Sequence, residues 1–267
     1  MARAVWSGAI SLGLVNIPVK LVTAVTDKDV RFHMLHAADG ARIKFKRVCA
    51  KHGDEVPGEE IVKGYEYTRG SHVTFTEKEL AAADPEATRS IELQEFVASE
   101  QIDPVYYEKP YYLLPDKNAG AAYQLLRAAL DKSGRVGIGR MVMHDKEHLV
   151  AIRVQGDILM LETMRFQEEV VPPEGIAAEA RQAGKSHVDA KQLKLAEQLI
   201  AGLSAEFDPQ KYRNEHRDKL MALIEQKAKG HDIVAEPTPE SAAPAIDLVT
   251  ALEKSLKKVR GKAKAAA

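Results

Sequence analysis

The sequence contains one cysteine, Cys49, among its 267 residues. A single cysteine excludes an intrachain disulfide, which favours a reducing compartment. No apolar run approaches the roughly 18 residues that a membrane-spanning helix needs. Asn16 and Pro18 interrupt the apolar stretch that follows Arg3, and no A-x-A-type cleavage site comes after it. The sequence therefore predicts a cytoplasmic protein without a membrane partner.

The common catalytic and nucleotide-binding motifs are also missing. The chain has no G-x-S-x-G, no Walker-type lysine loop and no H-E-x-x-H. Gly137-Ile138-Gly139 precedes an expected strand instead of opening a helix, so it does not form a phosphate-binding loop. We expect no catalytic residue, no cofactor and no metal ion, and hence a binding protein and not an enzyme.

The chain has no global excess of positive charge. Its 38 lysines and arginines are balanced by 39 aspartates and glutamates, which gives a net charge of −1. Residues 251–267 carry six cations against Glu253, a local charge of +5, so the rest of the chain has −6. Any surface for nucleic acid must therefore be local and lie among acidic regions.

A local excess of positive charge lies in residues 42–48, where Arg42, Lys44 and Lys46 alternate with apolar residues. An extended segment has a period of two, which would place the cations on one face and the apolar side chains on a packed back. Such a face suits the phosphate backbone of DNA, although a solvated strand face is the simpler alternative. The candidate DNA-binding residues are Arg31, Arg42, Lys44, Lys46, Arg47, Lys51, Lys63 and Arg69.

The first 170 residues have the apolar alternation of strands. Strands are expected at residues 17–25, 73–75, 91–93, 111–114, 136–144, 149–154 and 158–166. Sequential strands with short turns pair antiparallel, and such sheets often close into barrels. The expected fold class is α+β, mainly β, with an antiparallel β-barrel core followed by a helical C-terminal arm.

Helices are expected at four places. Thr76 and Glu79 form a capping box that begins one helix, and a second runs over residues 119–132 and ends at Gly134. Beyond Pro172-Pro173 the leucines recur every four residues, at Leu195, Leu199 and Leu203, and residues 212–227 outline a further helix. The apolar stripes of this arm must be covered by the barrel or by a partner, and both options stay open.

The C-terminal part, residues 233–267, combines a linker with a basic amphipathic tail. Residues 236–244 are rich in proline and alanine, and Leu248, Leu252, Leu256 and Val259 then form a short apolar stripe. An isolated helix of this length is marginal in water, so we expect the tail to order on a partner.

Three further groups of residues are weaker candidates for a functional site. His33, His36, Cys49 and His52 have the N/S donors of a zinc site, but alternation would put the first two on opposite faces, and a second thiolate is missing. Tyrosines 106, 107, 111 and 112 could stack on bases, although packing in the sheet or at a subunit contact is the better interpretation. Carboxylates that a metal-dependent nuclease could use occur at Glu92, Glu95, Glu100, Asp103 and Glu108, with a spacing that fits no single face.

Several segments of the chain resemble the bacterial Ku family, the DNA-end-binding proteins of non-homologous end joining. These segments are residues 6–15 and 17–21 near the start, Glu60–Tyr67, Ile102–Leu113, residues 137–140 with 147–151, Leu195–Ile200 and Phe207–Tyr212. Because they occur in order along nearly the whole chain, the resemblance is far more specific than any single motif.

The resemblance implies a barrel core, residues 1–190, that carries an extended β-rich bridge at about residues 40–72. It also implies a helical arm, residues 191–232, that embraces a second subunit. The implied function is a nucleoid-associated homodimeric ring that encircles double-stranded DNA ends. The tail stripe of Leu248, Leu252 and Leu256 is similar to the segment of the family that recruits the multidomain end-joining ligase. A nuclease or an abasic-site lyase acting on DNA ends is the alternative function.

Overall fold

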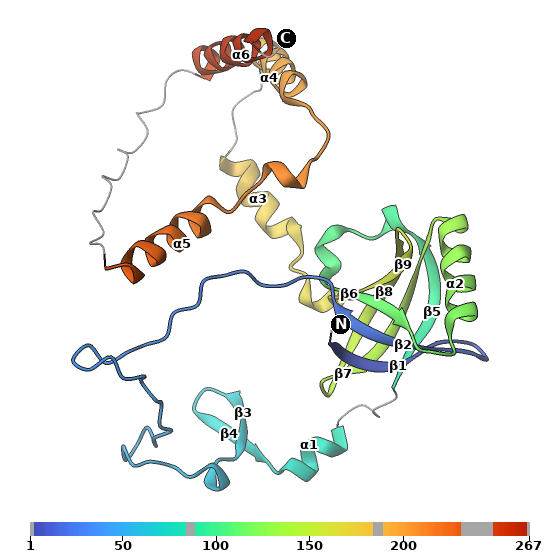
Figure 1. The fold of residues 1–267 in the computed structure, drawn as a ribbon, viewed down its shortest axis with the longest axis vertical. Coiled ribbons are helices and arrows are strands. Elements are labelled where there is room, and N and C mark those ends of the chain that lie inside the picture. Colours follow the sequence, from blue (N-terminus) through green and yellow to red (C-terminus); the bar gives the residue numbers. More distant parts are fainter. Residues whose placement is uncertain (1–2, 84–88, 184–188, 231–247, 266–267) are drawn as a thin grey trace. The chain divides into compact units, whose positions relative to one another are not determined.

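The computed structural model of the chain describes residues 3–83, 89–183, 189–230 and 248–265 (Figure 1). The strands are β1 (Ala4–Leu12), β2 (Val15–Thr23), β3 (Lys63–Thr68), β4 (Ser71–Phe75), β5 (Ser90–Ala98), β6 (Tyr107–Pro115), β7 (Arg135–Met143), β8 (Lys146–Gln155) and β9 (Ile158–Met164). The α-helices are α1 (Glu77–Ala83), α2 (Gly120–Ser133), α3 (Pro173–Ala183), α4 (Ala190–Leu203), α5 (Glu215–Ala228) and α6 (Leu248–Ala265).

Among the described residues, seven strands close into a barrel in the order β1-β2-β6-β9-β8-β7-β5. All neighbouring pairs are antiparallel except β1 and β5, which run parallel and complete the closure. Closure leaves the sheet without edges that could pair with another chain. The expected α+β fold with a barrel core and helices at the C-terminal end is thus confirmed.

The interior of the barrel holds the apolar side chains that alternate along its strands. Ile10, Leu21, Leu113, Ile152 and Leu161 are each 0% exposed. Burying one such side chain stabilises a fold by about 1.5–3 kcal/mol, so this set specifies the register of the strands.

Helix α2 covers one end of the barrel with a stripe of Tyr123, Leu126 and Leu130 (Figure 1). Gly134 ends the helix in the left-handed conformation, with φ of 62°, which a residue without a Cβ adopts at little cost. The buried Tyr123 hydroxyl donates to the carbonyl of Leu113 on β6 and accepts from the N–H of Leu159 on β9, both at 2.7 Å.

Residues 24–89 form a long insertion between β2 and β5 (Figure 1). Both of these strands are hydrogen-bonded to β1, on its opposite sides: the insertion leaves the barrel where Val22 pairs with Ala4 and re-enters it where Ser90 pairs with Ala9. It contains the two-stranded sheet β3–β4 and α1. The predicted capping box of α1 is present: Thr76 Oγ1 accepts from the N–H of Glu79, and the Glu79 carboxylate accepts from the N–H of Thr76.

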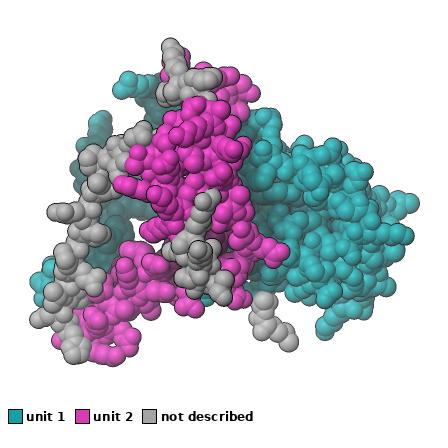
Figure 2. Space-filling view, turned by 90° about the horizontal axis from the view of Figure 1, so that it is seen from above, with its two compact units in different colours: residues 1–28, 33–171 teal, residues 29–32, 172–267 magenta. Residues whose placement is uncertain are grey.

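The chain divides into two compact units, coloured separately in Figure 2. The first contains the barrel and most of the insertion, up to Val171, and the second contains residues 29–32 and the helices that follow Pro172. Within the second unit, α6 packs on α4. No helix in the described ranges combines the length and the hydropathy needed to cross a membrane. The expected linker, residues 236–244, lies outside the described residues.

Candidate nucleic-acid interface

The cationic segment lies between two hairpin turns of the insertion. In the first turn, the N–H of Ile43 donates to Met34 and the N–H of His36 donates to Ala41, at 3.0 and 2.8 Å. The second turn begins where the N–H of Val56 donates to the carbonyl of Arg47 at 2.9 Å. The two turns keep the intervening backbone in place without a continuous strand partner.

The predicted packed back of this segment is wrong for the single chain. Only two isolated bridges, Leu35–Arg42 and Val48–Glu55, replace the expected strand pairing in the described part of the segment. Ile43 and Phe45 are 45% and 81% exposed. The insertion has no second layer here to bury them, which periodicity within one segment cannot reveal.

Positive charge is segregated along the segment. Five cations and no carboxylate lie between Gly40 and Gly53, whereas Asp54, Glu55 and Glu59 follow directly. Lys46 Nζ lies 2.6 Å from Glu55 Oε2, and both side chains are more than half exposed. Exposed ion pairs contribute about 0–1 kcal/mol to stability, so Lys46 can exchange Glu55 for another anion at little cost in free energy.

All eight predicted DNA-binding residues are exposed: Arg31, Arg42, Lys44, Lys46, Arg47, Lys51, Lys63 and Arg69. Within the described ranges, six of them have no ion pair: Arg42, Lys44, Arg47, Lys51, Lys63 and Arg69. Lys63 begins β3 and Arg69 lies in the β3–β4 turn, beside Gly70 with φ of 83°. The structure therefore distributes the candidates over the cationic segment and a separate hairpin.

The two halves of the candidate zinc site do not converge. His36 Nδ1 lies 2.9 Å from Asp39 Oδ1, and Cys49 Sγ lies 3.5 Å from His52 Nδ1. In the described part of the chain, no group of three or more His, Cys, Asp or Glu side chains could hold a metal ion. Hydrogen bonds from the backbone amides of His52 and Lys51 lower the pKa of the Cys49 thiol.

The carboxylates considered for a nuclease have structural roles or are solvated. Asp103 accepts from the N–H of Val105 at 2.9 Å and caps a short 3-10 helix. Glu108 accepts from the Thr163 hydroxyl at 3.1 Å. Glu92, Glu95 and Glu100 are exposed, and none belongs to a group of potential ligands within the described ranges.

The clustered tyrosines belong to the barrel. Tyr111 is 4% exposed in the core, and the Tyr106 hydroxyl donates to the side chain of Gln167. Burial raises the pKa of the Tyr107 phenol, and the negative charge of Glu162 raises it further. Packing in the sheet, the preferred interpretation of these tyrosines, is thus confirmed for Tyr111.

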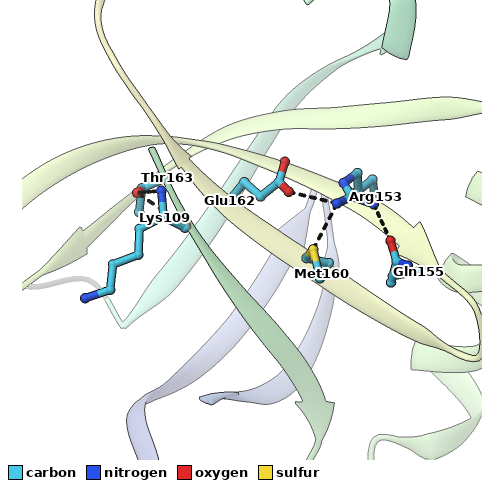
Figure 3. Close-up of polar contacts among 6 residues, drawn as sticks. All are labelled: Lys109, Arg153, Gln155, Met160, Glu162 and Thr163. Atoms are coloured by element: carbon cyan, nitrogen blue, oxygen red, sulfur yellow. Dashed lines mark hydrogen bonds and ion pairs between the residues drawn. The ribbon is translucent and has the colours of Figure 1, made fainter. Parts of the chain in front are cut away.

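Sequence reasoning missed an ion-pair network on the outer face of the barrel (Figure 3). Arg153 on β8 lies 2.8 Å from Glu162 on β9, and their side chains are 32% and 13% exposed. Arg153 also donates to Gln155 at 2.6 Å. Diagonal pairs of opposite charge on neighbouring strands stabilise a sheet, but identifying this one requires the register.

The predicted tail stripe is helical and meets α4. Leu256 is 8% exposed and Leu252 is half-buried, and both lie on α6. Leu248 is the first residue of this helix, and its side chain lies outside the described residues. On α4 the half-buried positions include Leu195 and Leu199, which share one face.

Comparison with known proteins gives a consistent result. Residues 11–195 match the family model of the Ku70/Ku80 beta-barrel domain. The chain is 46% identical over 261 residues to "Non-homologous end joining protein Ku" of Anaeromyxobacter sp. (strain K), an alignment that covers 97% of this chain and 87% of the relative.

Proteins of the same name from other organisms align over similar lengths. The protein of Heliobacterium modesticaldum is 42% identical, with 97% of this chain and 93% of the relative covered. That of Archaeoglobus fulgidus is 38% identical, with 97% and 100% covered. The similarity therefore extends beyond the barrel into the helices of the second unit.

Proposed function

Because the chain belongs to the Ku family, we propose that it binds double-stranded DNA ends without sequence specificity and acts in double-strand break repair by non-homologous end joining. In this proposal it is a scaffold without catalytic activity of its own. Two copies form a ring around the duplex, and the ring recruits the multidomain ATP-dependent ligase.

One observation supports the DNA-binding proposal: the insertion carries five exposed cations in a row without an intervening carboxylate. The insertion is attached to the barrel at both ends, through β2 and β5, which flank β1. Contacts from lysine and arginine to phosphates give affinity by releasing counterions and carry no sequence information. A loop that is held at both ends is suited to pass around a duplex. A closed ring then loads only where the duplex has an end.

The experiment that tests end binding compares linear, hairpin-capped and covalently closed circular duplexes of equal length by mobility shift, across a range of salt concentrations. We expect binding to the linear duplex, loss of binding when both ends are blocked, and steep weakening with salt. Equal affinity for the closed circle would contradict encirclement.

The proposed homodimer is supported by exposed apolar side chains in the second unit. Ile200, Leu203, Phe207 and Tyr212 are between 63% and 80% exposed, and the rings of the last two stack with centroids 5.8 Å apart. Exposed apolar groups of this kind mark interaction surfaces. Light scattering of the wild type and of Leu203→Glu with Phe207→Glu tests this: the wild type should be a dimer and the variant a monomer, and a monomeric wild type would contradict the ring.

The proposed ligase contact uses the apolar stripe of α6, which also packs on α4. Leu256 cannot be covered by α4 and by a partner at the same time, because it is already 8% exposed in the single chain. Ligase binding would therefore displace α6 from α4.

A further inference from the structure

The two ends of the barrel differ in chemistry. At the end covered by α2, the interior positions are Leu113 on β6 and Leu159 on β9, both 0% exposed. Toward the other end, beyond the buried pair Tyr111 and Leu161, the same two strands place Lys109 opposite Thr163. His148 on β8 lines the same cavity. The barrel thus has one apolar, covered end and one polar end, which we call the mouth.

The mouth contains a cavity of about 310 Å³. Tyr111, Met143 and Thr163 form buried walls. The more exposed lining residues are Glu108, Lys109, His144, Lys146 and His148. Mouths of barrels that combine apolar walls with a few convergent polar groups are common ligand sites.

A two-residue turn fixes one side of the mouth. His144 and Asp145 have φ of 52° and 60°, and they join Met143 at the end of β7 to Lys146 at the start of β8. Positive φ at both central positions is the geometry of a type I′ hairpin turn, whose twist matches that of the flanking strands. His144 and Lys146 are therefore held by a tight connection and not by a long mobile loop.

The lysines of the mouth are not held in ion pairs in the part of the chain that the structure describes. Within the described ranges, neither Lys109 nor Lys146 makes an ion pair, whereas Arg140 and Arg153 on β7 and β8 pair with glutamates at 3.1 and 2.8 Å. The Lys109 ammonium lies 5.7 Å from the centre of the Tyr111 ring. In Figure 3 it points away from the Arg153–Glu162 pair.

One carboxylate also lines the mouth. Glu108 accepts a hydrogen bond from the Thr163 hydroxyl at 3.1 Å, and this hydroxyl accepts from the N–H of Lys109 at 3.2 Å. Thr163 is 2% exposed, so these bonds fix the backbone around Lys109. With one carboxylate against two lysines, the mouth keeps an excess of positive charge before any contribution from its histidines.

We propose that the mouth binds a phosphate monoester, with Lys109 and Lys146 as its counter-charges and His144 and His148 as additional hydrogen-bond donors. A phosphate monoester offers three terminal oxygens and close to two negative charges at neutral pH. Charge-assisted hydrogen bonds from ammonium groups are among the stronger polar contacts. The cavity has room for the phosphate and for part of the group that carries it.

The test uses the full chain labelled with ¹³C-methyl methionine and titrated with inorganic phosphate at constant ionic strength. The Met143 methyl, assigned with Met143→Leu, should shift and saturate. Lys109→Gln with Lys146→Gln should raise the dissociation constant about tenfold or more, because it removes both ammonium groups that make charge-assisted hydrogen bonds to the phosphate. The matched control, Lys117→Gln with Lys132→Gln, removes two exposed lysines near the two ends of α2 and should leave the constant unchanged.

Two further titrations identify the source of the phosphate. Tighter binding of duplexes with a 5′-phosphate than with a 5′-hydroxyl, abolished by the mouth variant, would assign the site to DNA termini. Binding of a 5′-mononucleotide without this difference would assign it to free nucleotides. An unchanged Met143 methyl, or equal binding by the mouth and control variants, would overturn the inference. The inorganic phosphate titration does not depend on DNA binding by the cationic segment, so the two proposals fail separately.

Discussion

The phenol oxygen of Tyr123 lies 2.7 Å from the carbonyl oxygen of Leu113, to which it donates, and this bond ties α2 to β6 at the covered end of the barrel. The same oxygen accepts from the N–H of Leu159. A buried hydroxyl that serves two backbone groups at once stabilises the barrel more than an exposed one.

Tyr123→Phe should lower the free energy of unfolding by about 1–3 kcal/mol, because it leaves the Leu113 carbonyl and the Leu159 N–H without this partner in the core. Urea denaturation measures the change. Tyr67→Phe is the control, since Tyr67 is 60% exposed and should show little effect. Equal stability of both variants would contradict a structural role of the Tyr123 hydroxyl.

Gly139→Ala should destabilise the pairing of β5 with β7. A Cβ at Gly139 would lie 2.3 Å from the carbonyl oxygen of Glu92, which is backbone and cannot rotate away. We expect a loss of about 1–3 kcal/mol in the free energy of unfolding, measured by thermal or urea denaturation. Gly137→Ala is the comparison, because its Cβ would first meet the side chains of Phe96 and Leu93 at 3.1 and 3.2 Å and should cost less.

Lys44→Gln should weaken DNA binding and reduce the slope of log K against log salt by about 0.9, the value for one phosphate contact. Lys46→Gln should have a smaller effect, because Glu55 already lies 2.6 Å from its ammonium. Lys44→Glu with Lys46→Glu should weaken binding further. Mobility shifts at several salt concentrations measure the affinity and the slope, with Lys117→Gln as the control. An equal slope in the wild type and in all variants would exclude the cationic segment from the interface.

Leu256→Glu should separate α6 from α4 and weaken ligase binding at least about tenfold, because it places a charge in the apolar contact. Amide hydrogen exchange on α4 should accelerate in the same variant. Lys257→Glu, on the exposed face of α6, is the control for the charge change. Ligase binding that persists in Leu256→Glu would show that the ligase uses another surface.

Lys20→Met should raise the pKa of Asp116 toward its ordinary value. The hydrogen bond from the Lys20 side chain, at 2.8 Å, lowers this pKa, and the N–H of Lys117 lowers it further. A lowered pKa in the folded state stabilises the fold above the ordinary pKa of aspartate, and this contribution is lost as pH falls through the lowered value. The stability difference between wild type and variant should therefore be present at neutral pH and vanish in acid.

A carboxyl-carbon NMR titration of Asp116 in both proteins measures the pKa directly. The N–H of Lys117 remains in the variant, so part of the lowering should persist. An Asp116 pKa that does not respond to Lys20→Met would contradict the ion pair.

The strands with regular alternation were predicted from sequence because burial on one face of a strand selects every second residue. This holds for β2. Strands β7, β8 and β9 have runs of consecutive buried residues and were predicted from the short turns that separate them. The parallel pairing of β1 with β5 was not predicted, since it joins segments about 80 residues apart and leaves no local signal. Helix α3 was not predicted, although proline is favoured in the first turn of a helix, where Pro173 stands.

The site was partly predictable. Exposure of the cationic side chains follows from their charge, and all eight candidates are exposed. The prediction that the apolar side chains of the cationic segment are buried was wrong for Phe45. Burial of Phe45 needs a second layer, which depends on other parts of the chain or on a partner. The mouth was not predicted because Lys109, His148 and Thr163 come from three strands, and only the order of these strands in the sheet brings the residues together.

The attachment of the insertion to two neighbours of β1 has a mechanical consequence. If a protease cuts the chain once within residues 24–62, the two fragments remain joined through the pairing of β1 with β5 and of β2 with β6. A nicked molecule would thus keep its barrel while losing a continuous loop, so the integrity of the loop can be separated experimentally from the folding of the domain that carries it.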